Sequence, residues 1–177
     1  MKAKNNGPLT EQELMHLAQH AVENSHDLLN EAGMLFEGGR WARAGALAVL
    51  AVEESGKAQL CHVWSAHIIP TRDDMDDPGT WADFWNSFVD HPDKLDRLMS
   101  RADGVGRCQD FGAWKEVAHV LHTNKLRCLY VDWLSGSGQG VLMTPSNITE
   151  QDAREMVELS RDFLRLVEGV RDSEQKN

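Results

Sequence analysis

The sequence predicts an all-α protein, an up-and-down bundle of four long helices with a short helical excursion between the second and the third. Three observations support this fold class. Apolar residues recur at helical spacing along most of the chain. The β-branched residues are scattered through these helical stretches, so no segment shows the alternation that is typical of a strand. Glycine, proline or a capping residue marks the breaks between the periodic stretches.

The length of 177 residues suits one ordinary domain with a sizeable core. We expect a flexible tail at residues 1–9, a single helical domain at residues 10–172 and a frayed end at residues 173–177. The three cysteines have no C-x-x-C spacing and are typical of reduced thiols in the cytosol. No signal segment or bilayer-length apolar run is present, so we expect a soluble cytoplasmic protein with no membrane contact.

The chain is acidic, with a formal net charge of −10. Phosphate contacts require a positive surface, so this charge argues against a protein that coats duplex nucleic acid. A local basic region remains open between His91 and Tyr130, where seven Lys or Arg stand against five Asp or Glu.

The first helix is predicted to begin after Thr10, because Thr10 and Glu13 form a capping box. Apolar residues follow at helical spacing to about Phe36. Gly38-Gly39 then breaks the helix. We expect the first and second helices to form an antiparallel hairpin across this break.

The second helix should lie in the interior of the protein. Every residue from Ala44 to Val52 is apolar or glycine, and a helix that is apolar all round is normally buried. The helix is predicted to continue to about Ile69 and to stop at Pro70.

The middle of the chain predicts shorter elements. Residues 71–80 form an acidic loop, and Thr80 at its end can cap the next helix. A short aromatic helix is expected at Trp81–Val89, a further short helix at Asp93–Arg101, and a glycine-punctuated loop at residues 103–112.

Two long helices complete the prediction. The first runs from Ala113 to about Leu134 and ends at the flexible turn SGSGQG. Thr149 caps the second. The apolar face predicted for this closing helix comprises Met156, Leu159, Phe163, Leu166 and Val170.

A cluster of charges at the end of the buried second helix is the main functional clue. Glu53, Glu54 and Lys57 follow directly after its apolar stretch, and burying charges is costly unless they meet partners. Lys57 can neutralise one carboxylate on its own helix, which leaves the other in need of a partner. When the apolar stripe of the second helix is continued at helical spacing, it reaches Glu54. Glu54 is therefore predicted to point most directly inward. A structural ion pair and a functional site are both open readings.

Other polar residues offer candidate chemistry. His91 follows a helix end and has Lys94 one turn later, so it could carry a proton near neutral pH, or simply cap the helix. Tyr130, the single tyrosine, is expected to be buried and to seek an acceptor such as Glu53 or Glu54.

The third long helix carries a second group. Lys115, His119 and His122 share one helical face, with Lys125 nearby. These side chains could bind substrate, together with Tyr130, or form an ordinary solvated basic face.

A di-metal bundle site is a different possibility. Two Glu-x-x-His motifs on separate helices, joined by single glutamates from two others, form the ligand set of ferritin-like proteins. The residues that could supply this set are Glu23, His26, Glu54, Glu116, His119 and either Glu155 or Glu158. The usual order alternates single glutamates with Glu-x-x-His, whereas here the first helix carries a pair, and such motifs also arise by chance.

Three stretches, in order along the chain, resemble one known family. They are the alanine-rich helix running into EESGK, the segment FWNSFVDHPDKL, and LYVDWLSGSGQGVLMTPSNITEQDA. Together they resemble the AbiV family of abortive-infection proteins, which are grouped with the HEPN helical domains.

The resemblance implies a bacterial phage-defence effector that acts on RNA or translation. It implies a HEPN-type domain that commonly dimerises and often cleaves RNA without a metal or other cofactor. The implied partners are a second copy of the chain, RNA or the ribosome, and a phage-encoded activator protein. The candidate site comprises Glu53, Glu54, Lys57, His91 and Lys94.

The sequence lacks one motif that is usual in HEPN ribonucleases, so a second function is also considered. Those enzymes usually carry Arg followed four to six residues later by His. The nearest matches here are Lys57 with His62 and Lys115 with His122, and lysine lacks the guanidinium fork that binds a phosphate. The alternative is a non-catalytic helical module that sequesters a partner such as the ribosome or a phage protein.

Overall fold

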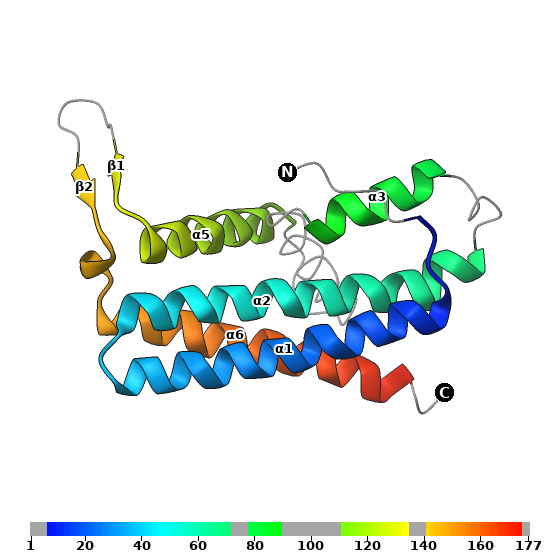
Figure 1. Cartoon of the computed structure of the whole chain (residues 1–177), viewed down its shortest axis with the longest axis horizontal. Helices are drawn as coiled ribbons and strands as arrows, with labels where there is room; N and C mark the ends of the chain where they lie inside the picture. Colours follow the sequence, from blue (N-terminus) through cyan, green and yellow to red (C-terminus); the bar gives the residue numbers. More distant parts are fainter. Residues whose placement is uncertain (1–6, 72–77, 90–110, 135–140, 175–177) are drawn as a thin grey trace.

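The fold is an all-α bundle whose long helices alternate in direction (Figure 1). The computed structural model describes residues 7–71, 78–89, 111–134 and 141–174. The long helices are α1 (Glu11–Glu37), α2 (Trp41–Val63), α5 (Phe111–Leu129) and α6 (Glu150–Glu174). The predicted fold class is confirmed. None of the helices in these ranges has the length and apolar character needed to cross a membrane.

The hairpin of α1 and α2 forms as predicted from local signals. The Thr10 side chain accepts a hydrogen bond from the Glu13 backbone, and the Glu13 carboxylate accepts one from the Thr10 backbone. At the other end, Gly39 has a φ of 70°, a left-handed conformation that glycine adopts without strain. This turn reverses the chain, so that α2 runs back along α1 (Figure 1).

Helix α2 is the central element, packed between α1, α5 and α6. Its small residues allow close approach of the neighbouring helices. A Cβ built on Gly45 would lie 2.4 Å from the Met156 Cε of α6 and 3.2 Å from the Cys128 Sγ of α5. The buried Ser160 hydroxyl of α6 donates to the Ala48 carbonyl of α2 at 2.7 Å. The predicted burial of α2 is confirmed.

The chain remains helical after the end of α2, but the type of helix changes. A π-helix, Trp64–Ile68, and a 3₁₀-helix, Ile69–Thr71, extend it. Pro70 lies in the last of these turns, in agreement with the expected end of the helix.

Helix α3 (Pro78–Val89) starts earlier than predicted. Proline suits a first turn because it has no backbone N–H to leave unpaired. Thr80 is therefore not the residue before the helix but a buried residue of its first turn. The predicted helix Asp93–Arg101 lies outside the described residues.

The N-terminal segment is held in place from Gly7 onward. The indole N–H of Trp85 in α3 donates to the Gly7 carbonyl at 2.9 Å, and Leu9 packs against the core. Residues 7–9 thus do not behave as the predicted flexible tail. Residues 1–6 are outside the described part of the chain.

The third long helix is shorter than predicted and leads into a β-hairpin. Helix α5 begins at Phe111 and ends at Leu129. Strands β1 (Asp132–Leu134) and β2 (Val141–Met143) then pair antiparallel, with Trp133 opposite Leu142. The expectation of no strand is wrong here, because a three-residue strand is too short to show an alternating pattern. The hairpin projects beyond the bundle in Figure 1.

Helix α6 begins at the predicted cap. The Asp152 carboxylate accepts hydrogen bonds from the Thr149 hydroxyl and backbone N–H, and the Asp152 backbone N–H donates to the Thr149 hydroxyl. Met156 and Phe163 are buried as expected, whereas Leu166 is exposed. The buried face instead turns through Ala153, Met156, Val157, Ser160, Phe163, Leu164 and Val167.

Candidate functional site

The predicted cluster at the end of α2 consists of two ion pairs with different surroundings. The Lys57 Nζ contacts the Glu54 Oε1 at 2.5 Å within α2, and both side chains are partly exposed. The Lys125 Nζ of α5 contacts the Glu53 Oε1 at 2.5 Å, with side chains that are only 6% and 2% exposed. The prediction that Lys57 neutralises one carboxylate of its own helix is confirmed. The prediction that Glu54 points most directly inward is wrong, because Glu53 is the buried carboxylate.

Lys125 reaches Glu53 because it lies on the buried face of α5. Leu121, Lys125 and Cys128 are spaced four and three residues apart and are all buried, as expected for one helical face. A lysine within an apolar stripe is thus the feature of the sequence that could have identified Lys125 as the partner of Glu53. The reading of Lys125 as part of a solvated basic face is wrong, and it is not available to an external substrate.

The remaining candidates on α5 differ in exposure where their side chains are described. Lys115 lies within the helix, His119 is exposed, and His122 is half-buried. Tyr130 is 60% exposed, so it is not the buried hydrogen-bond partner of Glu53 or Glu54 that the sequence predicted. Its position one residue after α5 explains this difference, because it follows the end of the helical stripe.

Lys57 connects the charge cluster to an aromatic layer on α3. Its Nζ lies 5.5 Å from the centre of the Phe88 ring, a distance at which a cation is attracted to an aromatic face. The Phe88 ring in turn packs on Phe84 and Trp85. The next predicted site residues along the sequence, His91 and Lys94, lie outside the described residues.

Buried serines hold the helices around the cluster. The Ser25 hydroxyl of α1 contacts the Ser55 hydroxyl of α2 at 2.9 Å, and both serines donate to the Ala51 carbonyl. Ser55 lies between Glu54 and Lys57 in sequence, so this contact fixes the same turn of α2 against α1. These bonds could not be predicted from the sequence, because serine is common on exposed helix faces as well.

The two described cysteines are buried thiols. Burial raises the pKa of Cys61 to about 12 and that of Cys128 to about 11. A nucleophilic cysteine needs a thiolate near neutral pH, so neither is suited to nucleophilic chemistry. Both are free cysteines, as the sequence predicted.

The described members of the possible di-metal set do not converge. Glu23 contacts His20 on the surface of α1, and the His26 Nε2 lies 2.7 Å from the Glu168 Oε1 of α6. Glu54 is held by Lys57. Within the described ranges no group of three His, Cys, Asp or Glu side chains is placed to hold a metal ion.

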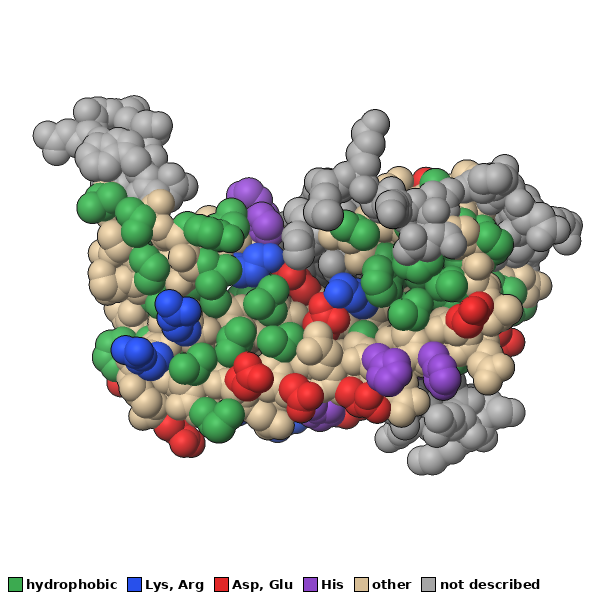
Figure 2. Space-filling model, in the orientation of Figure 1, with side chains coloured by type: hydrophobic (Ala, Val, Ile, Leu, Met, Phe, Trp, Pro, Cys, Tyr) green, Lys and Arg blue, Asp and Glu red, His purple; other side chains and the backbone are tan. Residues whose placement is uncertain are grey.

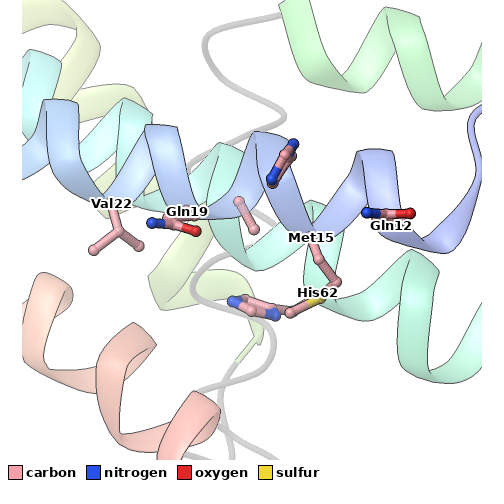
Figure 3. A pocket seen from close by; sticks show the side chains of 7 residues that line it. Gln12, Met15, Gln19, Val22 and His62 are labelled. Carbon is pink, nitrogen blue, oxygen red and sulfur yellow. The ribbon is translucent and has the colours of Figure 1, made fainter.

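A pocket of about 180 Å³ lies beside α1, near the end of α2. His62 lines it together with residues of α1, including Gln12, Gln19 and Val22, and Figure 3 shows the imidazole beside the Met15 side chain. Lys57, by contrast, contacts Phe88 of α3. The Lys57 and His62 pair therefore faces two different elements and does not form a joint site like the Arg and His of a ribonuclease motif.

The comparisons with known proteins give one family. The AbiV family model, of the HEPN type, matches residues 13–165. No curated protein and no solved structure gave a match. The matched range takes in the α1–α2 hairpin, the charge cluster, the β-hairpin and most of α6. The chain therefore belongs to the AbiV family, a membership that assigns it to abortive-infection defence against phage.

Proposed function

We propose that the chain is a cytoplasmic abortive-infection effector that acts by binding a partner in the infected cell, such as the ribosome or a phage protein. The observation that supports this proposal is the buried Glu53–Lys125 pair. It joins α2 to α5 inside the bundle, so this pair serves to hold the two helices together. Binding would then use the outer surface of the effector, without chemistry at the cluster.

The charges of the cluster are poorly accessible to a substrate and already have partners. A catalytic carboxylate or ammonium must come within hydrogen-bond distance of the group it acts on. Glu53 and Lys125 lie inside the protein, and Glu54 and Lys57 engage each other. An RNA phosphate would have to displace a partner that already compensates the burial of these charges.

A metal-independent ribonuclease is the second candidate function. The contact between Lys57 and Phe88 favours it, since α3 leads in sequence to His91 and Lys94. A histidine could move the ribose 2′-hydroxyl proton and a lysine could stabilise the charged phosphorane. In that case His91 and Lys94 carry the chemistry, and the Glu53–Lys125 pair only supports them.

One experiment separates the two functions. Cells expressing the wild type, the double variant Glu53→Leu with Lys125→Met, or His91→Ala are challenged with phage, and plating efficiency is measured. Each purified protein is also incubated with total bacterial RNA, with and without EDTA. A well-packed apolar pair can replace a buried ion pair without loss of the fold. A binding effector therefore retains protection within about threefold in both variants, because neither removes its outer surface.

The opposite results identify the enzyme. RNA cleavage that is insensitive to EDTA and is abolished in His91→Ala would show that the protein is a ribonuclease and overturn the binding proposal. Loss of protection in the double variant, with an unchanged circular dichroism spectrum, would show that the buried charges themselves take part in the activity.

A further inference from the structure

Two histidines lie one helical turn apart on the surface of α1. His16 and His20 are four residues apart, so their side chains project from the same face of the helix. Both residues are exposed, and their ring centres are 6.1 Å apart. Histidine side chains lie close together at the surface over α1 in Figure 2. We call these two residues the α1 histidine pair.

The spacing of the α1 histidine pair suits a single metal ion. A ring nitrogen binds zinc at about 2.1 Å, so two imidazoles that share one ion have ring centres at most about 6.5 Å apart. The pair lies within this limit. Because both side chains are exposed, they can change rotamer and bring one nitrogen of each ring onto the ion without moving the helix. Two histidines at this spacing on one helical face also hold zinc in metalloproteases.

Glu23 holds one ring of the pair in the form that a metal ion needs. An ionised carboxylate only accepts hydrogen bonds, so the His20 Nδ1–H donates to the Glu23 Oε2, at 3.0 Å, and the lone pair of a neutral ring is on Nε2. The Gln19 amide donates to the Glu23 Oε1 at 2.9 Å. The hydrogen bonds from Gln19 and His20 lower the pKa of Glu23 below its ordinary value, so the carboxylate is ionised at neutral pH. A carboxylate behind a ligating imidazole is a recurrent feature of metal sites.

The charge of α1 favours the approach of a cation. The helix contains six carboxylates and neither lysine nor arginine, and the whole chain carries −10. A surface of one sign raises the local concentration of ions of the opposite sign. A divalent cation is therefore attracted to the same helix that presents the two imidazoles.

We propose that the α1 histidine pair binds a divalent transition-metal ion of the zinc type. His16 and His20 supply two nitrogen ligands, Glu23 orients the His20 ring, and water fills the other positions of the ion. Imidazole suits Zn²⁺, Ni²⁺ and Cu²⁺, whereas Mg²⁺ and Ca²⁺ prefer oxygen ligands. A site with two protein ligands agrees with the finding that the described residues contain no metal-holding group of three. The inference goes beyond the proposed function, because the ion binds purified protein without phage or RNA.

The test is isothermal titration calorimetry of the full chain with ZnCl₂, and with MgCl₂ as the control ion. His16→Ala and His20→Ala each remove one ligand, and Glu23→Gln removes the carboxylate charge but keeps a hydrogen-bond acceptor. His26→Ala is the matched control, because His26 is an exposed histidine of α1 with no second histidine four residues away. Circular dichroism establishes that each variant is folded.

The expected result is one Zn²⁺ bound per wild-type chain and no binding of Mg²⁺. Loss of an outer-shell partner costs about 10–100-fold in metal affinity, so Glu23→Gln should raise the zinc dissociation constant at least about tenfold. Each variant of the α1 histidine pair should lose at least as much affinity, because it removes a ligand itself. The His26→Ala control should bind zinc as the wild type does.

Three calorimetric results would overturn the inference. They are no zinc binding at ion concentrations up to about 1 mM, unchanged zinc binding in both variants of the α1 histidine pair, and an equal loss of affinity in the His26→Ala control. Nuclear magnetic resonance of the histidine nitrogens tests the role of Glu23. Zinc should shift the Nε2 resonance of His20 most strongly, and coordination through Nδ1 would overturn that role.

Discussion

At Glu53 the cost of burying a carboxylate is offset by a lysine from another helix. Removing one member of such a pair leaves an unpaired charge in the interior, whereas removing both leaves an apolar contact. The Glu53–Lys125 pair therefore fixes α5 against α2 mainly through the penalty for separating them. The Glu54–Lys57 pair is partly exposed, and exposed pairs contribute little.

We predict that Lys125→Met destabilises the protein by about 3–5 kcal/mol, because it leaves Glu53 buried without this partner. The double variant Glu53→Leu with Lys125→Met should recover most of that loss. Urea unfolding of the two single variants and the double variant measures the coupling free energy. Lys57→Met is the control, with an expected change below about 1 kcal/mol. Additive effects at Glu53 and Lys125 would show that the pair does not couple the helices.

At the scale of an element, α6 illustrates how a local signal sets the start of a helix. The Thr149 hydroxyl and backbone N–H donate to the Asp152 carboxylate. These hydrogen bonds lower the pKa of Asp152 below its ordinary value. A lowered pKa in the folded state stabilises the fold above the unfolded-state pKa, and this contribution is lost as the pH falls through the folded-state pKa.

We predict that Asp152→Asn lowers the free energy of unfolding by about 0.5 kcal/mol at neutral pH, a small value because the carboxylate is exposed to solvent. The difference from the wild type should shrink as the pH falls through the lowered pKa of Asp152, because the wild-type carboxylate becomes protonated there. Urea unfolding at several pH values measures it, with Asp162→Asn as a control on the same helix. A difference that does not change with pH would contradict the role of the charged cap.

At the scale of the whole molecule, the segment before α1 helps to hold α3 in place. The Gly7 carbonyl accepts a hydrogen bond from Trp85, and Leu9 packs on the core. Trp85 belongs to the aromatic layer that Lys57 contacts through Phe88. Residues far apart in sequence therefore share in positioning α3 beside the charge cluster.

We predict that deletion of residues 1–9 destabilises α3 more than deletion of residues 1–6 does. The longer deletion removes one hydrogen bond and a partly buried leucine, which together contribute about 2 kcal/mol. Hydrogen exchange of the α3 amides measures the change, with the amides of α2 as an internal reference. Equal exchange in both truncated proteins would show that the N-terminal segment does not support α3.

Much of the fold follows from local sequence signals. Capping residues at Thr10 and Thr149 and the glycine turn at Gly39 mark helix ends through bonds within a few residues. The apolar run of α2 determined its burial. These features depend on short-range geometry, which the sequence displays directly.

The sequence could not determine which helix lies opposite each polar side chain. Periodicity alone predicted that Glu54 rather than Glu53 points inward, and the contact between Glu53 and Lys125 depends on how α5 packs against α2. The same limit applies to the β-hairpin, whose three-residue strands are joined by long-range pairing. The tertiary structure thus decided that Glu53 and Lys125 form an internal ion pair between helices, because burial and pairing are properties of packed elements rather than of single ones.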